Sequence, residues 1–347
     1  MEFGFCTFGD LGYPLQERTP MGEATHSRIK NLIDEMLFAD ELGMDVFGLG
    51  EHHRKDYVVS NPVTILAAAA PLTKNIKLSS AVTVLSSDDP VRVYQQFATL
   101  DQLSTGRAEI MVGRGSFIES FPLFGYNLQD YDELFDEKLD LLLKINEQQD
   151  GPWNGKHRPS LDSLHIYPLP FNKKIPIWVA AGGTPASAIR AGKLKLPLTL
   201  AIIGGAPAQF ARFTNLYKQS AIAAGIPKEE IQLGINSHVY IAETSQQALD
   251  EFFPPYAEVM SRIGKERGWP PLSRQSFYFS ASEEGALMVG SPQQVIDKIL
   301  YEYELFGHSR FLAQMSMGNL DHKKLRRSME LFATVVVPQV KKALKKI

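Results

Sequence analysis

Residues 46–85 read VFGLGEHHRKDYVVSNPVTILAAAAPLTKNIKLSSAVTVL, and the order of apolar runs in this stretch decides the fold. Residues 46–50 and 78–85 each have the length and composition of a buried strand. Asn61-Pro62 lies between them and predicts a helix over about 62–73, because asparagine caps a helix and proline is favoured at its first position. Strand, helix and strand in this order predict a parallel βαβ unit.

The same alternation continues in both directions from this unit. Further strands are predicted at 3–8, 108–112, 176–180, 198–203, 232–241 and 310–317. Helices are predicted at about 25–42, 90–103, 131–146, 185–192, 207–224, 245–267, 291–306 and from 322 onwards. Eight strands alternating with helices predict an α/β fold, a (β/α)8 TIM barrel formed by residues 1–347 as one domain. Residues 151–174 are expected to form a connecting segment that interrupts the alternation. Residues 268–290 are expected to form a lid-like insertion on the C-terminal face.

The composition excludes several classes of protein. The 347 residues carry a net charge of -3, from 36 basic and 39 acidic side chains, so no basic surface for nucleic acid is expected. Cys6 is the single cysteine, so a disulfide within the chain or a cysteine zinc site is excluded. No apolar run reaches 18 residues and the N-terminus does not look like a signal peptide. We therefore expect a cytoplasmic protein without membrane contact.

Glu51-His52-His53 follows the second predicted strand, where enzymes with this barrel carry their active sites. Neighbouring side chains on an extended backbone point to opposite sides, so the two histidines are a poor chelating pair. The HExxH spacing is also absent, and no metal site is predicted. One histidine at the barrel mouth would suit general acid or base chemistry near neutral pH. The alternative is that both histidines are structural.

Two further strand exits carry residues suited to an anion. Arg114 lies between two glycines, and arginine holds a phosphate or carboxylate through paired hydrogen bonds. Gly182-Gly183-Thr184 precedes a predicted helix, whose free N–H groups and dipole favour a phosphate. The alternatives are a tight turn with a surface arginine, and a plain helix cap formed by Thr184. Both exits belong to the same rim of the predicted barrel.

Taken together, these segments resemble the bacterial luciferase-like flavin monooxygenase family. The resemblance extends over nearly the whole chain, and residues 81–115 are its most specific part. The matching segments are 51–53, 81–85, 90–92, 100–107, 113–115, 181–185, 289–295 and 337–338. Luciferase itself has a cysteine at the position of Gly113 and a glutamate and a serine at those of Gly182-Gly183. These departures favour a generic member of the family over a light-emitting enzyme.

The resemblance implies a barrel that binds FMN, reduced by a separate flavin reductase, and uses O2 to oxidise a small organic substrate. It implies that His52 is the catalytic residue, that the family's non-proline cis peptide lies at Ser80–Ala81 under the flavin ring, and that the protein is a homodimer. The residues implied to bind the cofactor are Ser80, Ala81, Arg114, Gly182, Gly183, Thr184 and Ser187.

Two other functions remain open on the same barrel. Some relatives use a deazaflavin and transfer hydride without oxygen, and a third possibility is a non-catalytic flavin-binding protein. The substrate itself is not readable from the sequence. Phe277, Tyr278 and Phe279 in the predicted lid suggest an apolar substrate surface, or equally a lid that packs against its own barrel.

Overall fold

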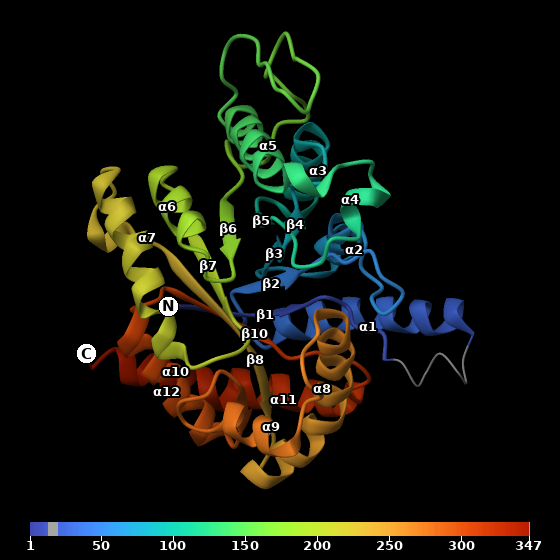
Figure 1. Cartoon of the computed structure of the whole chain (residues 1–347), viewed down its shortest axis with the longest axis vertical. Helices are drawn as coiled ribbons and strands as arrows, with labels where there is room; N and C mark the ends of the chain where they lie inside the picture. The colour runs from blue at the N-terminus through green and yellow to red at the C-terminus, as the bar shows by residue number, and fades with distance from the viewer. Residues whose placement is uncertain (13–19, 347) are drawn as a thin grey trace.

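In the computed structural model, which describes residues 1–12 and 20–346, eight parallel strands close into a barrel surrounded by helices (Figure 1). β10 is hydrogen-bonded to both β1 and β8, and this double pairing closes the barrel. The predicted (β/α)8 fold is therefore confirmed. The barrel strands are β1 (Glu2–Thr7), β2 (Val46–Leu49), β3 (Lys77–Ser80), β5 (Ala108–Gly113), β6 (Ile177–Ala181), β7 (Leu198–Ile202), β8 (Leu233–Ile241) and β10 (Arg310–Gln314).

The helices that follow Asn61 and Asp89 begin at the predicted cap residues. The Asn61 side chain accepts a hydrogen bond from the Thr64 N–H, and Asp89 accepts hydrogen bonds from the N–H groups of Val91 and Arg92. The helices are α1 (Met21–Glu41), α2 (Pro62–Ala69), α3 (Pro90–Ser104), α4 (Ser120–Leu123), α5 (Tyr131–Asn146), α6 (Pro185–Lys193), α7 (Ala211–Ala223), α8 (Ser245–Arg267), α9 (Arg274–Ala281), α10 (Pro292–Phe306), α11 (His322–Leu331) and α12 (Val337–Leu344).

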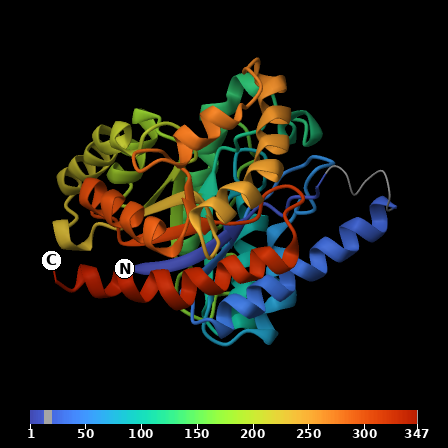
Figure 2. The same ribbon diagram turned by 90° about the horizontal axis from the view of Figure 1, so that it is seen from below.

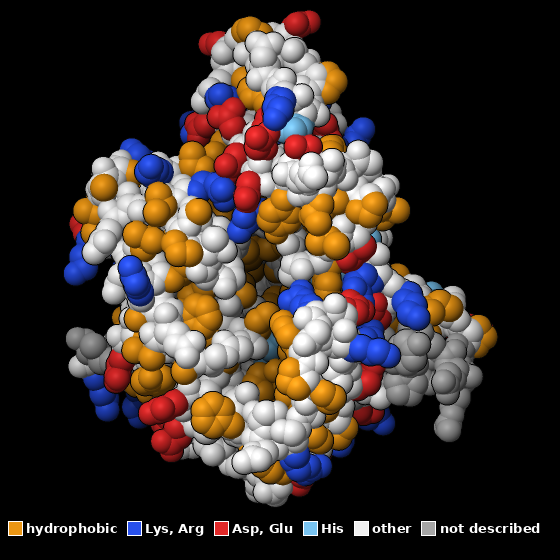
Figure 3. All heavy atoms as spheres, in the orientation of Figure 1, with side chains coloured by type: hydrophobic (Ala, Val, Ile, Leu, Met, Phe, Trp, Pro, Cys, Tyr) orange, Lys and Arg blue, Asp and Glu red, His pale blue; other side chains and the backbone are white. Residues whose placement is uncertain are grey.

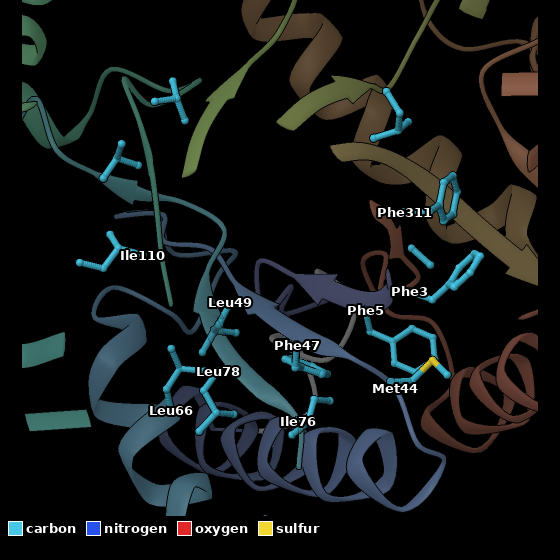
Figure 4. Close-up of a cluster of buried hydrophobic side chains, with 14 of the residues drawn as sticks. Phe3, Phe5, Met44, Phe47, Leu49, Leu66, Ile76, Leu78, Ile110 and Phe311 are labelled. Carbon is cyan, nitrogen blue, oxygen red and sulfur yellow. The ribbon is translucent and has the colours of Figure 1, made fainter. Parts of the chain in front are cut away.

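The alternation of side chains along each strand divides the core into two layers. Phe3, Phe5 and Phe47 point outward and pack among the residues between barrel and helices (Figure 4). Cys6 and Val46 belong to a smaller cluster with Met111, Trp178 and Leu312, from β5, β6 and β10. These five residues come from five of the eight barrel strands and fill part of the barrel interior.

The predicted strand at 78–85 is wrong in one respect, because the structure breaks it into β3 and the short β4 (Thr83–Val84). β4 still pairs with β5, so the chain returns to the sheet after two residues. The Ser80 hydroxyl exchanges two hydrogen bonds with the backbone of Met111, at 2.9 and 3.0 Å, which ties the end of β3 to β5.

The predicted irregular insertion at 268–290 contains α9 and the short strand β9 (Met288–Gly290), which pairs with β8. Phe277 is fully buried in a second hydrophobic cluster, against Phe253 and Tyr256 of α8. Tyr278 and Phe279 are exposed at the surface. Of the three aromatic residues, Phe277 therefore packs against α8, and Tyr278 and Phe279 do not line the cavity described below.

The C-terminal segment lies alongside α1, as the view from below shows (Figure 2). The predicted terminal helix is interrupted by one π-helical turn at Phe332–Val336, just before Pro338. Proline has no N–H to donate to the preceding turn, which accounts for the interruption. Within 151–174, the predicted connecting segment, the only strand-like pairing is one antiparallel bridge between Trp153 and Leu161. No helix in the described part of the chain has the length and apolar character needed to cross a membrane.

An ion pair crosses the barrel interior near the N-terminal ends of the strands. The Arg310 guanidinium donates to both carboxylate oxygens of Glu109, at 2.5 and 2.9 Å, and its carbon lies 4.0 Å from the Trp178 ring centroid. Glu109 and Arg310 are buried, and the partly exposed Glu2 accepts a further bond from Arg310 at 2.8 Å. β5 and β10 are not neighbours in the sheet, so this pair spans the barrel.

Candidate functional site

A cavity of about 540 Å³ opens at the C-terminal ends of the barrel strands. Ligand cavities in proteins commonly measure about 300–1,000 Å³ and are mostly apolar with a few polar groups. Its walls come from the exits of β1, β2, β5, β6 and β7, and its floor includes Cys6, Met111, Asn236 and Leu312. Figure 3 shows a hollow near the middle of the molecule, with hydrophobic side chains inside it and Lys or Arg side chains at its edge.

One side of the floor is formed by the break between β3 and β4. The cis peptide bond lies at Ala81–Val82, one residue later than the predicted Ser80–Ala81. Ser80 is still held in the sheet by its bonds to Met111, so the chain leaves the sheet only after it. Ala81 and Val82 line the cavity and Ser80 does not.

Glycines on two neighbouring strands make room for this break. A Cβ at Gly48 would lie 2.7 Å from the Ala81 Cβ, and a Cβ at Gly113 would lie 2.8 Å from a Val82 methyl group. Both separations are shorter than real carbon contacts, so a side chain at either position would displace Ala81 or Val82.

Arg114 is held at the rim of the cavity by three neighbours. Its guanidinium pairs with Asp132, donates to the Ser187 hydroxyl at 3.3 Å, and lies 5.1 Å from the Tyr131 ring centroid. The Asp132 side chain is 69% exposed, so this ion pair is weak and an incoming phosphate can compete with it. Ser187 is buried behind Arg114 and does not line the cavity itself.

The backbone before α6 has the features of an anion cradle. Gly182 and Thr184 line the cavity, and a Cβ at Gly182 would meet no atom within 4 Å, so the backbone there borders open space. Gly183 has a φ of 111°, which a residue with a side chain rarely adopts. Thr184 is the N-cap residue of α6, but its side chain makes no capping hydrogen bond. The helix N-terminus is therefore not satisfied by its own cap.

His52 lines the same cavity from the exit of β2, inside an aromatic box. Its ring centroid lies 4.7 Å from Phe8, 4.6 Å from Tyr57 and 4.7 Å from Phe117. Burial, together with the nearby charges of Arg54 and His53, lowers the pKa of His52 to about 3. The imidazole is therefore neutral near pH 7 and offers one N–H donor and one nitrogen acceptor.

This burial makes the contribution of His52 to stability depend on pH. Between its usual pKa of 6.5 and the folded value of about 3, the unfolded chain binds a proton at His52 that the folded chain does not. Relative to His52→Gln, we expect the wild-type free energy of unfolding to fall by about 1.4 kcal/mol per pH unit as the pH drops through this range. Urea unfolding of both proteins at pH 4, 5, 6 and 7 measures this; a pH-independent difference contradicts the assignment.

Two cation–π contacts close one side of the aromatic box. The guanidinium carbons of Arg54 and Arg267 lie 4.6 and 5.4 Å from the Phe117 ring centroid. Arg267, the last residue of α8, also donates to the Ser116 carbonyl at 3.0 Å, and Arg54 pairs with Glu266. The end of α8, and not the predicted lid aromatics, therefore reaches the cavity mouth.

His53 points away from His52, as the alternation of side chains predicted. Its Nε2 lies 3.2 Å from a Glu51 carboxylate oxygen, and its ring packs edge-on against Phe124. Among the described residues, the groups that could together hold a metal ion are Asp130, Glu133 and His157, outside the cavity. Neither histidine of the motif belongs to this group.

The structure thus brings His52, Ala81, Arg114, Gly182 and Thr184 together around one cavity. Gly183 and Ser187 are close to the cavity rim but do not line the cavity. Ser80 is buried in β3, where it is hydrogen-bonded to Met111. Other lining residues were not predicted from the sequence: Phe8, Tyr131, Thr199, Phe210 and Asn236. Asn236 follows the inward alternation of β8, which was the one signal available for it.

Comparisons with known proteins agree with this geometry. The sequence model of the family described as luciferase-like monooxygenase matches residues 1–309. A 4-hydroxyprotoasukamycin monooxygenase from Streptomyces nodosus subsp. asukaensis is 24% identical over 343 residues, which cover 96% of this chain and 92% of that protein.

Solved structures share the whole fold. Monooxygenase RslO1 from Streptomyces bottropensis superposes with a TM-score of 0.83 at 25% identity, covering 98% of this chain and 99% of that one. The oxygenating constituent of 3,6-diketocamphane monooxygenase from Pseudomonas putida, in complex with FMN, gives 0.78 at 22% identity, with 98% of each chain covered. The coenzyme F420-dependent tetrahydromethanopterin reductase of Methanopyrus kandleri gives 0.72 at 19%, covering 98% of this chain and 99% of that one.

Proposed function

Because the chain belongs to the luciferase-like monooxygenase family, we propose that it uses reduced FMN and O2 to oxidise a small organic substrate in the cavity at the barrel mouth. One observation carries this proposal: a rim suited to bind a phosphate lies at the mouth of a mostly apolar cavity, and a neutral histidine lines that cavity. Arg114 and the N-terminus of α6 form the rim, and His52 lines the cavity from the exit of β2.

The residues present fit FMN. At 182–184 the backbone borders the cavity at the positive end of the α6 dipole, where the Thr184 side chain makes no capping hydrogen bond, and Arg114 adds a charge that the Ser187 hydroxyl helps to orient. Ala81 and Val82 present a flat, apolar surface on which a ring system can lie, with no side chain at Gly113 to displace it. The cavity of about 540 Å³ has room for a ring and a small substrate.

The chain's own groups have separable tasks in this function. Arg114 and the α6 N-terminus bind and orient the phosphate, and the apolar floor excludes water from the reacting atoms. His52, being neutral, positions an oxygen atom by donating its N–H, or accepts a proton at its other nitrogen. When bound, reduced FMN supplies the electrons that activate O2.

Replacing Arg114 with alanine is expected to weaken FMN binding by about 1.5–3 kcal/mol, the loss typical of a hydrogen bond to a charged group. Flavin fluorescence titration measures the affinity. Riboflavin, which has no phosphate, is the matched control, and its affinity should be nearly the same in Arg114→Ala and wild type. Equal loss for both ligands, or no loss for FMN, would place the phosphate elsewhere.

A deazaflavin-dependent hydride transfer is the second candidate, favoured by the fold shared with the F420-dependent reductase. It needs no oxygen, so the two candidates separate by oxygen dependence of turnover. We also propose that a separate flavin reductase supplies the reduced FMN and that the protein is a homodimer. Sedimentation of the purified protein tests the dimer.

A further inference from the structure

A second, smaller cavity of about 190 Å³ lies beside the main one, and Glu51 is the one described residue that lines both. The smaller cavity is rich in polar side chains. They include His53, Thr83, Ser87, Asp88 and Gln96. Glu51 is 6% exposed, so its carboxyl group forms part of the partition between the two cavities.

The proposed reaction takes up one proton. With the reduced cofactor as the anion FMNH⁻ and a substrate S, the balance is FMNH⁻ + O2 + S + H⁺ giving FMN + SO + H2O. His52 is badly placed to import that proton, because Phe8, Tyr57 and Phe117 surround it and its imidazole is neutral. Another route between solvent and the main cavity is needed.

We propose that Glu51 and His53 form this route, passing a proton from the smaller polar cavity into the main one. The inference rests on the proposed function. His53 gives its Nε2 proton to the Glu51 oxygen 3.2 Å away, and the Glu51 carboxylic acid gives a proton to the reacting oxygen in the main cavity. His53 is then protonated again by solvent through the smaller cavity.

The charges around Glu51 and His53 favour binding of a proton by these two side chains near neutral pH. The hydrogen bond to Glu51 raises the pKa of His53, and burial raises the pKa of Glu51 against the opposing effect of His53. Asp88 faces both groups and Glu119 faces His53, each favouring protonation. Lys138 opposes this effect, because its charge lowers the pKa of Asp88, whereas Asp89 raises it. The Lys138 ammonium donates to the Ser86 carbonyl at 2.8 Å and lies 3.8 Å from the Tyr126 ring centroid.

The first test needs no cofactor. In the cofactor-free protein, NMR titration of the His53 imidazole, identified by its loss in His53→Gln, reports proton binding at this ring. Glu51→Gln should weaken that proton binding at least about tenfold, because an opposite charge in contact is removed. Unchanged titration of His53 overturns the coupling. His165, an exposed histidine paired with Asp150, is the control that should not change.

The second test follows reoxidation of bound reduced FMN by O2 to FMN and H2O2, which also consumes one proton. Glu51→Gln and His53→Ala should slow this step about 10- to 100-fold, and its solvent isotope effect should grow, because proton uptake then limits the step. Added imidazole should restore His53→Ala, but His165→Ala should behave as wild type. Wild-type rates and isotope effects in both variants overturn the route. If wild type binds no FMN, the proposed function fails, and the NMR titration alone decides the Glu51–His53 coupling.

Discussion

Glu109→Ala is expected to lower the free energy of unfolding by about 3 kcal/mol or more. Removing one partner of a buried ion pair costs roughly 3–5 kcal/mol, because the other charge stays buried without compensation. Arg310 is 1% exposed, and its remaining partner, Glu2, is half-buried, so the effect should lie toward the lower end of that range. Equilibrium unfolding in urea measures it.

A matched double variant separates the pair from the space it fills. Glu109→Leu with Arg310→Met replaces both charges by apolar groups of similar volume, and such replacements are often neutral or stabilising. We therefore expect the double variant to be more stable than Glu109→Ala. A Glu109→Ala protein as stable as wild type would show that the pair contributes nothing.

Loss of His52 is expected to lower turnover by about 10²- to 10⁴-fold, the usual contribution of a positioned acid or base. Affinity for FMN should change little, because the proposed phosphate contacts lie at Arg114 and α6, at the exits of other strands. The measurement is substrate-dependent oxygen consumption with supplied reduced FMN, after a screen of small organic molecules has given a substrate.

His52→Phe and His52→Asn make this test specific. Phenylalanine keeps the packing against Phe8, Tyr57 and Phe117 but has no ring nitrogen, so it should be as inactive as His52→Ala. Asparagine keeps a donor and an acceptor and should recover part of the activity. A His52→Ala protein that binds FMN normally and turns over at the wild-type rate would remove His52 from the mechanism.

The order of strands and helices could be predicted because each has a local signal. Apolar runs of strand length and the caps at Asn61, Asp89 and Ser291 are readable from a few neighbouring residues. The rim at Arg114 and Gly182–Thr184 could be predicted for the same reason, since strand exits of a closed barrel share one face.

The rest depends on contacts between distant segments. The break after Ser80 depends on the room left at Gly48 and Gly113, on other strands. The aromatic box of His52 needs Phe117, fixed in turn by Arg267 at the end of α8. The partner of Arg310 lies across the barrel at Glu109, and nothing near either residue indicates the pair.

The most direct test of the proposed function is an anaerobic titration of the purified protein with reduced FMN and, separately, with a reduced deazaflavin cofactor. The account predicts that reduced FMN binds, that Arg114→Ala weakens this binding, and that admitting O2 then reoxidises the bound cofactor. Binding of the deazaflavin alone, with no detectable affinity for reduced FMN, would contradict it.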